Sequence, residues 1–181
     1  MRPVVTLSLL GALTLAPAAV EGLAAAPAQA EAGATLAGTY ALNAAASDDV
    51  NKAIDKAVAQ MNFVMRPIAH SRLKSTNEVY QRLAIAMTGQ TVRTTFDSRQ
   101  PIESPASGAP IKWTREDGEK FDVSTAVSGE KSIKQTFKGT DGQRVNVYTL
   151  SADGAKLTMN VTITSPKLSA PLTYKLVFNR K

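Results

Sequence analysis

Apolar residues recur at every second position through most of the chain after Asn77, and this period predicts β-strands with one buried face. The first such segment runs from Val79 to Met87. A turn at Thr88-Gly89-Gln90 leads into a second segment that ends at Phe96, so the two predict a β-hairpin. A similar alternation over residues 36–42 predicts one earlier strand.

From Pro110 the alternation continues as a meander, because short turn sequences interrupt it at near-regular spacing. Tight turns of this kind join neighbouring antiparallel strands. The last two strands are expected over residues 157–163 and 172–178, which makes nine strands in all. The turn sequences are Asp117-Gly118, Gly129, Asp141-Gly142 and Asp153-Gly154.

One long segment, from Ser47 to about Ser75, follows a helical period instead. Its apolar residues are three and four positions apart, as on one face of an amphipathic helix. Ser47 is a suitable N-cap, and Pro67 is expected to end or kink the helix before a short second helix through Arg72. We therefore expect a helical insertion over residues 48–73. The apolar stripe consists of Val50, Ile54, Ala57, Val58, Met61 and Met65.

The segment from Asp97 to Ala109 is rich in proline, serine and glycine, which predicts a long polar loop. We expect it to be the most mobile part of the domain. Long loops of this kind are often functional, so it is also a candidate contact surface.

An open antiparallel sheet of this length leaves exposed edges and an uncovered apolar face. Closure into a barrel removes both problems, with the helical segment over one end. The expected fold is therefore mainly β: an antiparallel meander closed into a single small barrel of about 8–10 strands, with an N-terminal helical lid between the first and second strands. An open sheet wrapped around the helix is the alternative.

The first 30 residues have the order of a secretory signal peptide. Met1-Arg2 precede an apolar run from Val4 to Leu15, and small residues follow as far as Ala28-Gln29-Ala30, an A-x-A cleavage sequence. A membrane anchor is the alternative, but the run is shorter than the about 20 residues that span a bilayer. We expect residues 1–30 to be removed, residues 31–181 to form one domain, and the protein to be exported to the periplasm or the extracellular space.

The formal net charge is +6, and the chain contains no cysteine. The lack of cysteine excludes disulfides, thiolate metal sites and a thiol nucleophile. A basic excess favours anionic partners, such as a component of the cell envelope. Lys and Arg are spread among acidic residues, so we expect no nucleic-acid partner. No segment after the first 30 residues is apolar enough to span a membrane.

Candidate catalytic and metal-binding groups are few. His70 is the only histidine, and with no second His or Cys to share a metal we interpret it as a surface residue. We therefore expect a non-enzymatic protein without metal or cofactor; an enzyme that uses His70 with Arg66 and Arg72 is the alternative. The carboxylates fall in predicted turns, where they serve the turn itself: Glu116, Asp117, Glu119, Asp141 and Asp153.

The order of these parts resembles the calycin barrels, which are the lipocalins and the cytosolic-type fatty-acid-binding proteins. Gly38-Thr39-Tyr40 is similar to their Gly-x-Trp motif, with Tyr in place of Trp, and Arg180 stands where lipocalins often pack a basic residue over the Trp. The helical insertion after the first strand is most similar to the fatty-acid-binding proteins. The Arg-x-Tyr sequence with which many of them hold a carboxylate is missing from the segment Tyr174 to Phe178. The resemblance therefore implies a barrel more than it implies a fatty acid.

The alternation also predicts which side chains face the interior. An apolar interior with a few polar groups is typical of small-molecule sites, but side chains alone fill many barrels of about eight strands. A filled core and a ligand cavity both remain open. We expect Met87, Val147 and Phe178 to face inward as well. The candidate ligand-binding residues are Tyr40, Met61, Met65, Gln81, Leu83, Ile85, Phe96, Phe121, Gln135, Phe137, Met159 and Tyr174.

Two functions follow from this prediction. The first is a non-enzymatic binding protein for an apolar or amphipathic small molecule, oriented by Gln81, Gln135 and Tyr174. The second is an interaction module, in which a filled barrel binds an envelope protein or an anionic polymer through its basic surface or through residues 97–109.

Overall fold

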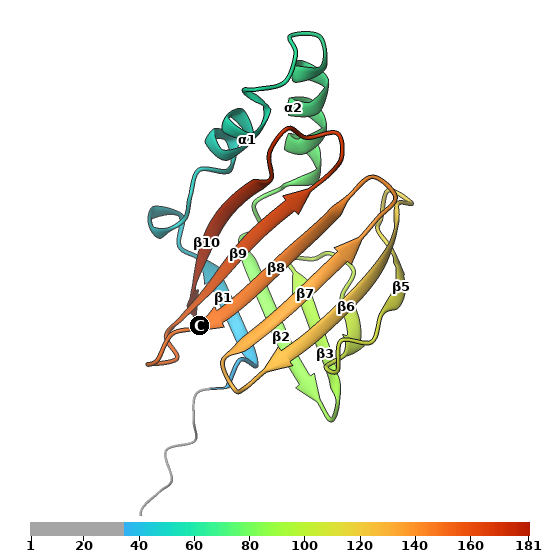
Figure 1. The fold of residues 1–181 in the computed structure, drawn as a ribbon. Coiled ribbons are helices and arrows are strands. Elements are labelled where there is room, and N and C mark those ends of the chain that lie inside the picture. Colours follow the sequence, from blue (N-terminus) through green and yellow to red (C-terminus); the bar gives the residue numbers. More distant parts are fainter. Residues whose placement is uncertain (1–34) are drawn as a thin grey trace, which may run out of the picture. The chain divides into compact units, whose positions relative to one another are not determined.

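A computed structural model describes residues 35–181, which form an antiparallel β-barrel with two α-helices (Figure 1). The predicted signal peptide, residues 1–30, lies outside the described residues. The strands are β1 (Gly38–Leu42), β2 (Arg82–Thr88), β3 (Thr91–Phe96), β4 (Ile102–Pro105), β5 (Ile111–Thr114), β6 (Lys120–Ser128), β7 (Ser132–Lys138), β8 (Gln143–Leu150), β9 (Lys156–Thr164) and β10 (Leu172–Arg180). The helices are α1 (Val50–Val58) and α2 (Met65–Thr76), preceded by a 3₁₀ turn, η1 (Ala44–Ala46).

The ten strands form one sheet in the order β4-β3-β2-β1-β10-β9-β8-β7-β6-β5. Strand β1 joins the two ends of the meander, because it pairs with β2 on one side and with β10 on the other. Except for β1 and β10, every pair of neighbouring strands in the sheet is consecutive in the sequence. The predicted closed meander with a helical insertion after the first strand is therefore confirmed.

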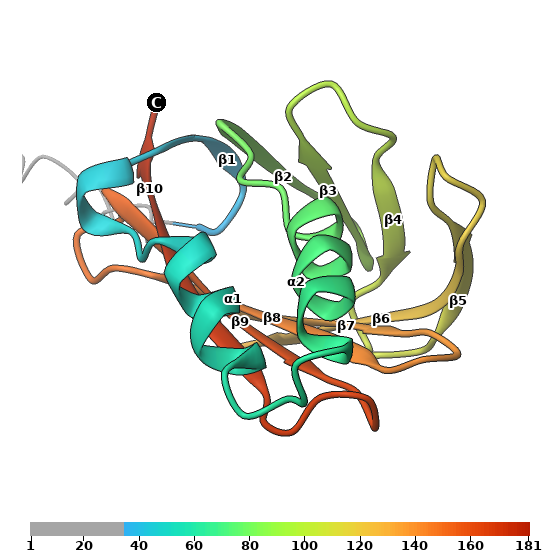
Figure 2. The same cartoon turned by 90° about the horizontal axis from the view of Figure 1, so that it is seen from above.

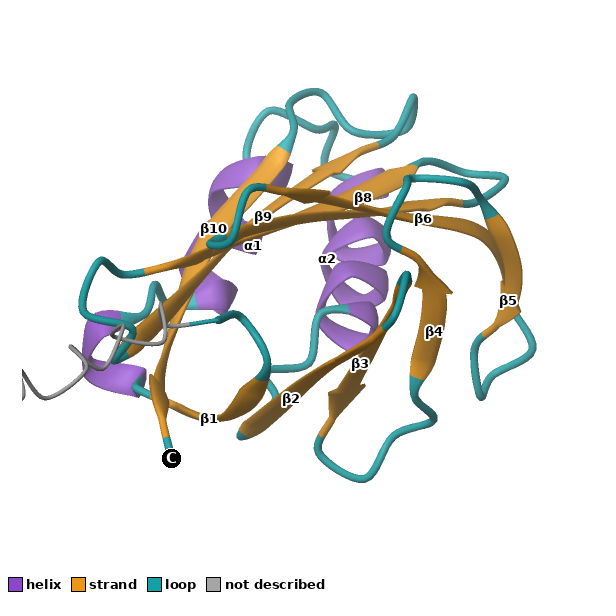
Figure 3. Cartoon of the chain, turned by 90° about the horizontal axis from the view of Figure 1, so that it is seen from below, coloured by secondary structure: helices purple, strands orange, loops and turns teal. Residues whose placement is uncertain are grey.

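The barrel is nearly closed, with a gap between the edge strands β4 and β5 (Figure 3). Residues 106–108 bridge one end of this gap. The N–H of Ala106 donates to the carbonyl of Gln90 at 2.8 Å, and the N–H of Val127 donates to the carbonyl of Ala106 at 3.0 Å. These bonds pair backbone groups that an open edge would leave without partners.

Strand β4 corrects the prediction of a polar loop over residues 97–109. Ile102 and Ser104 are buried, and β4 pairs with β3. The strand is short because Pro101 precedes it and Pro105 ends it, and a proline can join a sheet only at such edge positions. Its two inward positions, one of them polar, are too few to show an alternating pattern in the sequence.

The two helices lie over one end of the barrel, with α1 against β10 (Figure 2). The break between them falls between Val58 and Met65, so the expected single apolar stripe through Met65 is wrong. Pro67 is the third residue of α2 and does not end a helix. It is tolerated there because N–H groups in the first turn have no intrahelical partner. No helix among residues 35–181 is long and apolar enough to span a membrane.

The N-cap of α1 is Asp49 and not Ser47. The carboxylate of Asp49 accepts the N–H groups of Asn51 and Lys52, which no helical carbonyl reaches. Ser47 instead links the segment before α1 to β10, because its hydroxyl accepts a hydrogen bond from the N–H of Val177 at 2.9 Å.

The main hydrophobic core lies inside the barrel and continues onto one face of α1. Tyr40, Leu83, Leu157 and Phe178 have no exposed surface, and Ile54 of α1 packs into the same cluster. A smaller second cluster beside the gap contains Ile102, Val123 and Phe137, with Ile111, Trp113 and Phe121 packed against them.

Candidate functional site

Most of the predicted interior residues are buried inside the barrel. These comprise Tyr40, Leu83, Ile85, Phe96, Gln135, Phe137, Met159 and Tyr174. Phe121 is half-buried in the second cluster, where its ring lies 6.3 Å from that of Phe137, centroid to centroid. The structure therefore places eight of the twelve candidates in the two hydrophobic clusters, counting Phe121, and the ninth, Gln135, among the buried polar residues.

The other candidates do not line the interior. Gln81 is exposed, and its N–H donates to the carboxylate of Asp97, so its predicted inward position is wrong. Met65 is 43% exposed at the start of α2, and Met87 is 39% exposed at the end of β2. Met61 is half-buried in the connection between the helices. For Met61 and Met65 the physical reason is that α1 ends at Val58, so neither methionine continues the stripe of α1 that faces the core.

Strand β8 turns its polar face inward, which the sequence pattern did not reveal. Val145 and Val147 alternate in the sequence and predict the buried face, but Val147 pairs with the exposed residues Lys134 and Asn160. The inward residues of β8 are Arg144, Asn146, Tyr148 and Leu150. Tyr148 and Leu150 could have identified this face, because their large apolar side chains alternate in step with Arg144 and Asn146 and not with the two valines.

The inward polar residues continue from β8 into a buried hydrogen-bonded layer. Gln135 lies at its centre with no exposed surface. Its Nε2 donates to Oγ1 of Thr94 at 3.1 Å and more weakly to Oγ1 of Thr125 at 3.4 Å. The hydroxyl of Ser104 also donates to Oγ1 of Thr125, at 2.6 Å. This part of the layer joins β3, β4, β6 and β7 across the barrel.

The same layer reaches the helices through β8. The hydroxyl of Tyr148 donates to Oε1 of Gln135 at 3.2 Å and accepts from Nδ2 of Asn146 at 3.2 Å. Nε of Arg144 then donates to Oδ1 of Asn146 at 2.9 Å. Burial raises the pKa of the Tyr148 hydroxyl well above its usual value, so this tyrosine is a neutral donor at any physiological pH.

Arg144 places a cation at the helix-covered end of the interior. Its Nη1 donates to Oδ1 of Asn77 at 3.2 Å, and the hydroxyl of Tyr174 donates to the same oxygen at 3.0 Å. None of the ion pairs found among residues 35–181 includes Arg144. A half-buried guanidinium that is bonded only to neutral acceptors retains its affinity for an anion.

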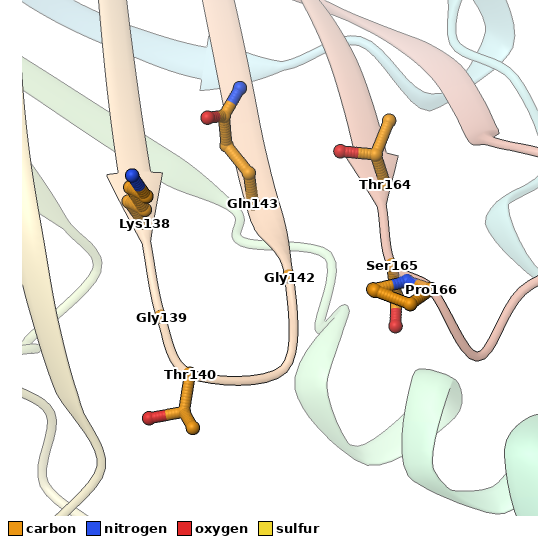
Figure 4. A pocket seen from close by; sticks show the side chains of 8 residues that line it. All are labelled: Lys138, Gly139, Thr140, Gly142, Gln143, Thr164, Ser165 and Pro166. Carbon is orange, nitrogen blue, oxygen red and sulfur yellow. The ribbon is translucent and has the colours of Figure 1, made fainter.

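The remaining interior space is occupied by side chains. The inward residues of the main core are at most 9% exposed, and the two best-defined hollows among the described residues lie on the outside. One of these, of about 370 Å³, lies between the β7–β8 turn and the end of β9 and contains none of the predicted residues (Figure 4). Its lining is Lys138, Gly139, Thr140, Gly142, Gln143, Thr164, Ser165 and Pro166.

His70 lies on α2 at the surface and joins the two helices. Its Nε2 is 3.1 Å from Oδ1 of Asp55 on α1. Among residues 35–181, no three His, Cys, Asp or Glu side chains come together as a metal site would require. The arrangement of His70 is that of a helix-to-helix contact, in agreement with its interpretation as a surface residue.

Comparison with known proteins shows the fold. No protein-family model and no curated protein sequence matches the chain. Among solved structures, a mutant of the REP1-NXSQ fatty acid transporter is 19% identical, with 81% of this chain and 98% of that chain covered and a TM-score of 0.52. Fatty-acid-binding protein 1 of Echinococcus granulosus is 14% identical, with 80% and 96% covered and a TM-score of 0.51.

A luciferase domain from the dinoflagellate Lingulodinium polyedrum has the same fold, at 10% identity and a TM-score of 0.50, with 80% of this chain and 42% of that chain covered. The chain thus has the barrel fold of the fatty-acid-binding proteins, as its resemblance to the calycins implied. Because this fold occurs both in fatty-acid-binding proteins and in a luciferase domain, the function has to be argued from the interior itself.

Proposed function

We propose that this protein is a non-enzymatic binding protein for an amphipathic small molecule, with an apolar body in the barrel and an acidic end at Arg144. The observation that carries the proposal is the guanidinium of Arg144, which faces the helix-covered end of the interior and is bonded to the neutral side chains of Asn77 and Asn146. Charge-assisted hydrogen bonds to a carboxylate are stronger than bonds to an amide oxygen.

The surroundings of Arg144 suit an anion with an apolar tail. The hydroxyl of Tyr174 lies beside it and supplies a second donor, as the shared contact with Asn77 shows. Next to it on the neighbouring strands stand Phe137 and Ile163, which are its direct cross-strand partners. An apolar wall beside a few polar groups is the usual composition of a small-molecule site.

A ligand has to displace side chains, because the interior is filled. The helix-covered end is the natural entrance, since α2 contains no buried residue and so can move at low cost. The candidate residues that we retain for the apolar body are Leu83, Ile85, Phe96, Phe137 and Met159, all buried around the interior.

The filled interior also supports a second function. A barrel whose buried polar groups satisfy one another is a stable scaffold without any ligand. In that case the protein would be an interaction module that binds an anionic envelope component through its basic surface. Under either function we propose that the protein acts after export, once residues 1–30 have been removed.

Fluorescence titration with 1-anilinonaphthalene-8-sulfonate, followed by displacement with dodecanoate or dodecan-1-ol, tests the proposal. Dodecanoate should displace the probe, and the variant Arg144→Gln should weaken dodecanoate binding by about tenfold or more, the effect of losing one charge-assisted hydrogen bond. Binding of the neutral alcohol should change little.

Arg93→Gln is the matched control, because it removes the same charge from the outside of β3, where Arg93 pairs with Glu103 at 3.2 Å. It should leave both affinities unchanged. Equal dodecanoate affinities in the two variants, or no binding by the wild-type protein, would reject an anionic ligand in the barrel and favour the interaction module.

A further inference from the structure

Helix α2 is attached to the barrel mainly at its C-terminal end. None of its residues is buried, and of its apolar side chains Leu73 packs against the main core. Two surface contacts join its other side chains to neighbouring elements: Nε2 of His70 lies 3.1 Å from the carboxylate of Asp55 on α1, and Arg72 forms an exposed ion pair with Asp141 at 3.4 Å. Exposed contacts of this kind contribute little to stability, so the C-terminal end decides how firmly α2 is held against the barrel.

The residue at that end, Asn77, is 5% exposed and forms hydrogen bonds in two directions. Its Nδ2 donates to the carbonyl of Leu73 at 2.9 Å, in the last turn of α2. Its Oδ1 accepts from Nη1 of Arg144 and from the hydroxyl of Tyr174, both inside the barrel. One amide side chain therefore links the end of the helix to the interior cation.

We propose that Asn77 is a latch. It holds α2 closed while its Oδ1 accepts the hydrogen bond from Arg144, and it releases α2 when the acidic group of a ligand accepts from Arg144 instead. This inference rests on the proposed function, because it assigns to Arg144 an anionic ligand. The new element is that a ligand bound in the interior controls the position of α2.

The exchange is favourable because the two acceptors differ in charge. The Asn77 oxygen is a neutral acceptor, whereas a carboxylate forms charge-assisted bonds with Arg144 and accepts from Tyr174 as well. Once it has lost both donors, the Asn77 oxygen would be buried without a partner, which is costly. The side chain then turns to water, and the end of α2 loosens with it.

The coupling acts in both directions. If a bound anion releases α2, then release of α2 must favour the anion to the same extent. A variant that lacks the Asn77 oxygen should therefore bind anions more tightly, because nothing competes for Arg144. A variant with a carboxylate at this position should bind them more weakly, because Arg144 is then already paired.

Hydrogen exchange of the amides of residues 65–76, with and without dodecanoate, tests the latch in the full-length chain. Without dodecanoate, Asn77→Ala should exchange about tenfold faster than the wild type, the effect of losing about one hydrogen bond. Dodecanoate should accelerate exchange in the wild type and have no further effect in Asn77→Ala. In Asn77→Asp the carboxylate pairs with Arg144 but cannot donate to the carbonyl of Leu73, so α2 should exchange as fast as in Asn77→Ala, while dodecanoate should bind at least about tenfold more weakly.

Tyr174→Phe separates the latch from ordinary capping of the helix. It removes one interior donor to Asn77 but leaves the bond from Asn77 to Leu73. If Asn77 is a latch, exchange in α2 should become faster; if Asn77 only caps the helix, exchange should not change. Arg72→Gln is the control, because it removes a surface contact of the same helix and should not change the response to dodecanoate.

The outcomes distinguish the two proposals. If dodecanoate binds the wild type and the exchange of α2 stays the same, the latch is wrong and the proposed function stands. If dodecanoate does not bind at all, both are wrong. Unchanged α2 exchange in Tyr174→Phe, in a variant shown to be folded by its thermal unfolding, also rejects the latch.

Discussion

The guanidinium of Arg180 lies over the ring of Tyr40, with its central carbon 5.1 Å from the ring centroid, and Nη2 donates to the Tyr40 hydroxyl at 2.9 Å. The same side chain donates to the carbonyls of Ala37 and Gly154, at 3.0 and 2.9 Å. Arg180 thus joins the start of β1, the β8–β9 turn and the end of β10. The sequence resemblance predicted this contact between a C-terminal basic residue and the aromatic residue of the first strand, and the structure confirms it.

Arg180→Ala should lower the free energy of unfolding by about 2–4 kcal/mol, because it removes a cation–π contact and several hydrogen bonds to buried groups. Urea denaturation of the purified protein measures the change. Arg93→Ala is the control, since its exposed pair with Glu103 should contribute less than about 1 kcal/mol. Equal losses in the two variants would show that Arg180 does not hold this end of the barrel together.

Gln135→Leu should lower the free energy of unfolding by about 2–4 kcal/mol, although leucine is of similar size and more apolar. The reason is that Tyr148, Thr94 and Thr125 would each lose a buried partner. Lys134→Leu, on the outer face of the same strand, is the matched control and should change stability little. A neutral or stabilising effect of Gln135→Leu would mean that the buried layer does not stabilise the barrel.

Stability should fall steeply above pH 10. Burial raises the pKa values of Tyr148, Tyr174 and Tyr40 above the ordinary value of 10.0, and Arg180 opposes the shift at Tyr40. A raised pKa in the folded state means that the folded protein holds these protons more tightly than the unfolded chain. The resulting stability is present below pH 10 and is lost as the pH rises above it.

Absorbance at 295 nm and circular dichroism, recorded together against pH, test this. The buried tyrosines should ionise only as the barrel unfolds. Ionisation of all the tyrosines near pH 10 in a protein that keeps its circular dichroism would contradict the burial of the layer.

In the β5–β6 turn, Arg115 lowers the pKa of Asp117 from 3.8 to about 2, through a side-chain hydrogen bond. A lowered pKa in the folded state contributes stability that is present above pH 3.8 and is lost as the pH falls towards 2. Arg115→Gln should raise the pKa towards its ordinary value, as measured by ¹³C NMR of the carboxyl carbon, while the backbone hydrogen bond from Glu119 still lowers it. An unchanged midpoint in this variant would remove Arg115 as the cause.

The alternation of apolar residues predicted the barrel because most strands have one apolar face. On β9 and β10 the predicted set, including Met159 and Tyr174, is the buried one. On β8 the same rule failed, because the inward residues Arg144 and Asn146 are polar and the outward residues Val145 and Val147 are apolar. The most important residue of the proposed site was therefore missed for a physical reason: a binding face need not be the more apolar face of its strand.

The helices and β4 show the limit of local patterns in another way. Met61 and Met65 continue the spacing of the α1 stripe, yet the chain leaves the helix after Val58. Asn77, which joins α2 to the interior, has no local sequence signal, since its partners Arg144 and Tyr174 are 67 and 97 residues away. Such contacts follow from the closure of the barrel and cannot be inferred from neighbouring residues.

Binding of an acidic ligand inside the barrel at Arg144 is tested most directly by an NMR measurement of contacts between ¹³C-labelled dodecanoate and the protein. Nuclear Overhauser effects are expected from the ligand chain to the methyl groups of Leu83 and Met159. The carboxyl resonance should shift on binding and lose this shift in Arg144→Gln. Contacts confined to Phe63 and Ile68, which are exposed at the tip of the helices, would contradict binding inside the barrel. In that case dodecanoate would bind outside the barrel, and the interior would be a filled core.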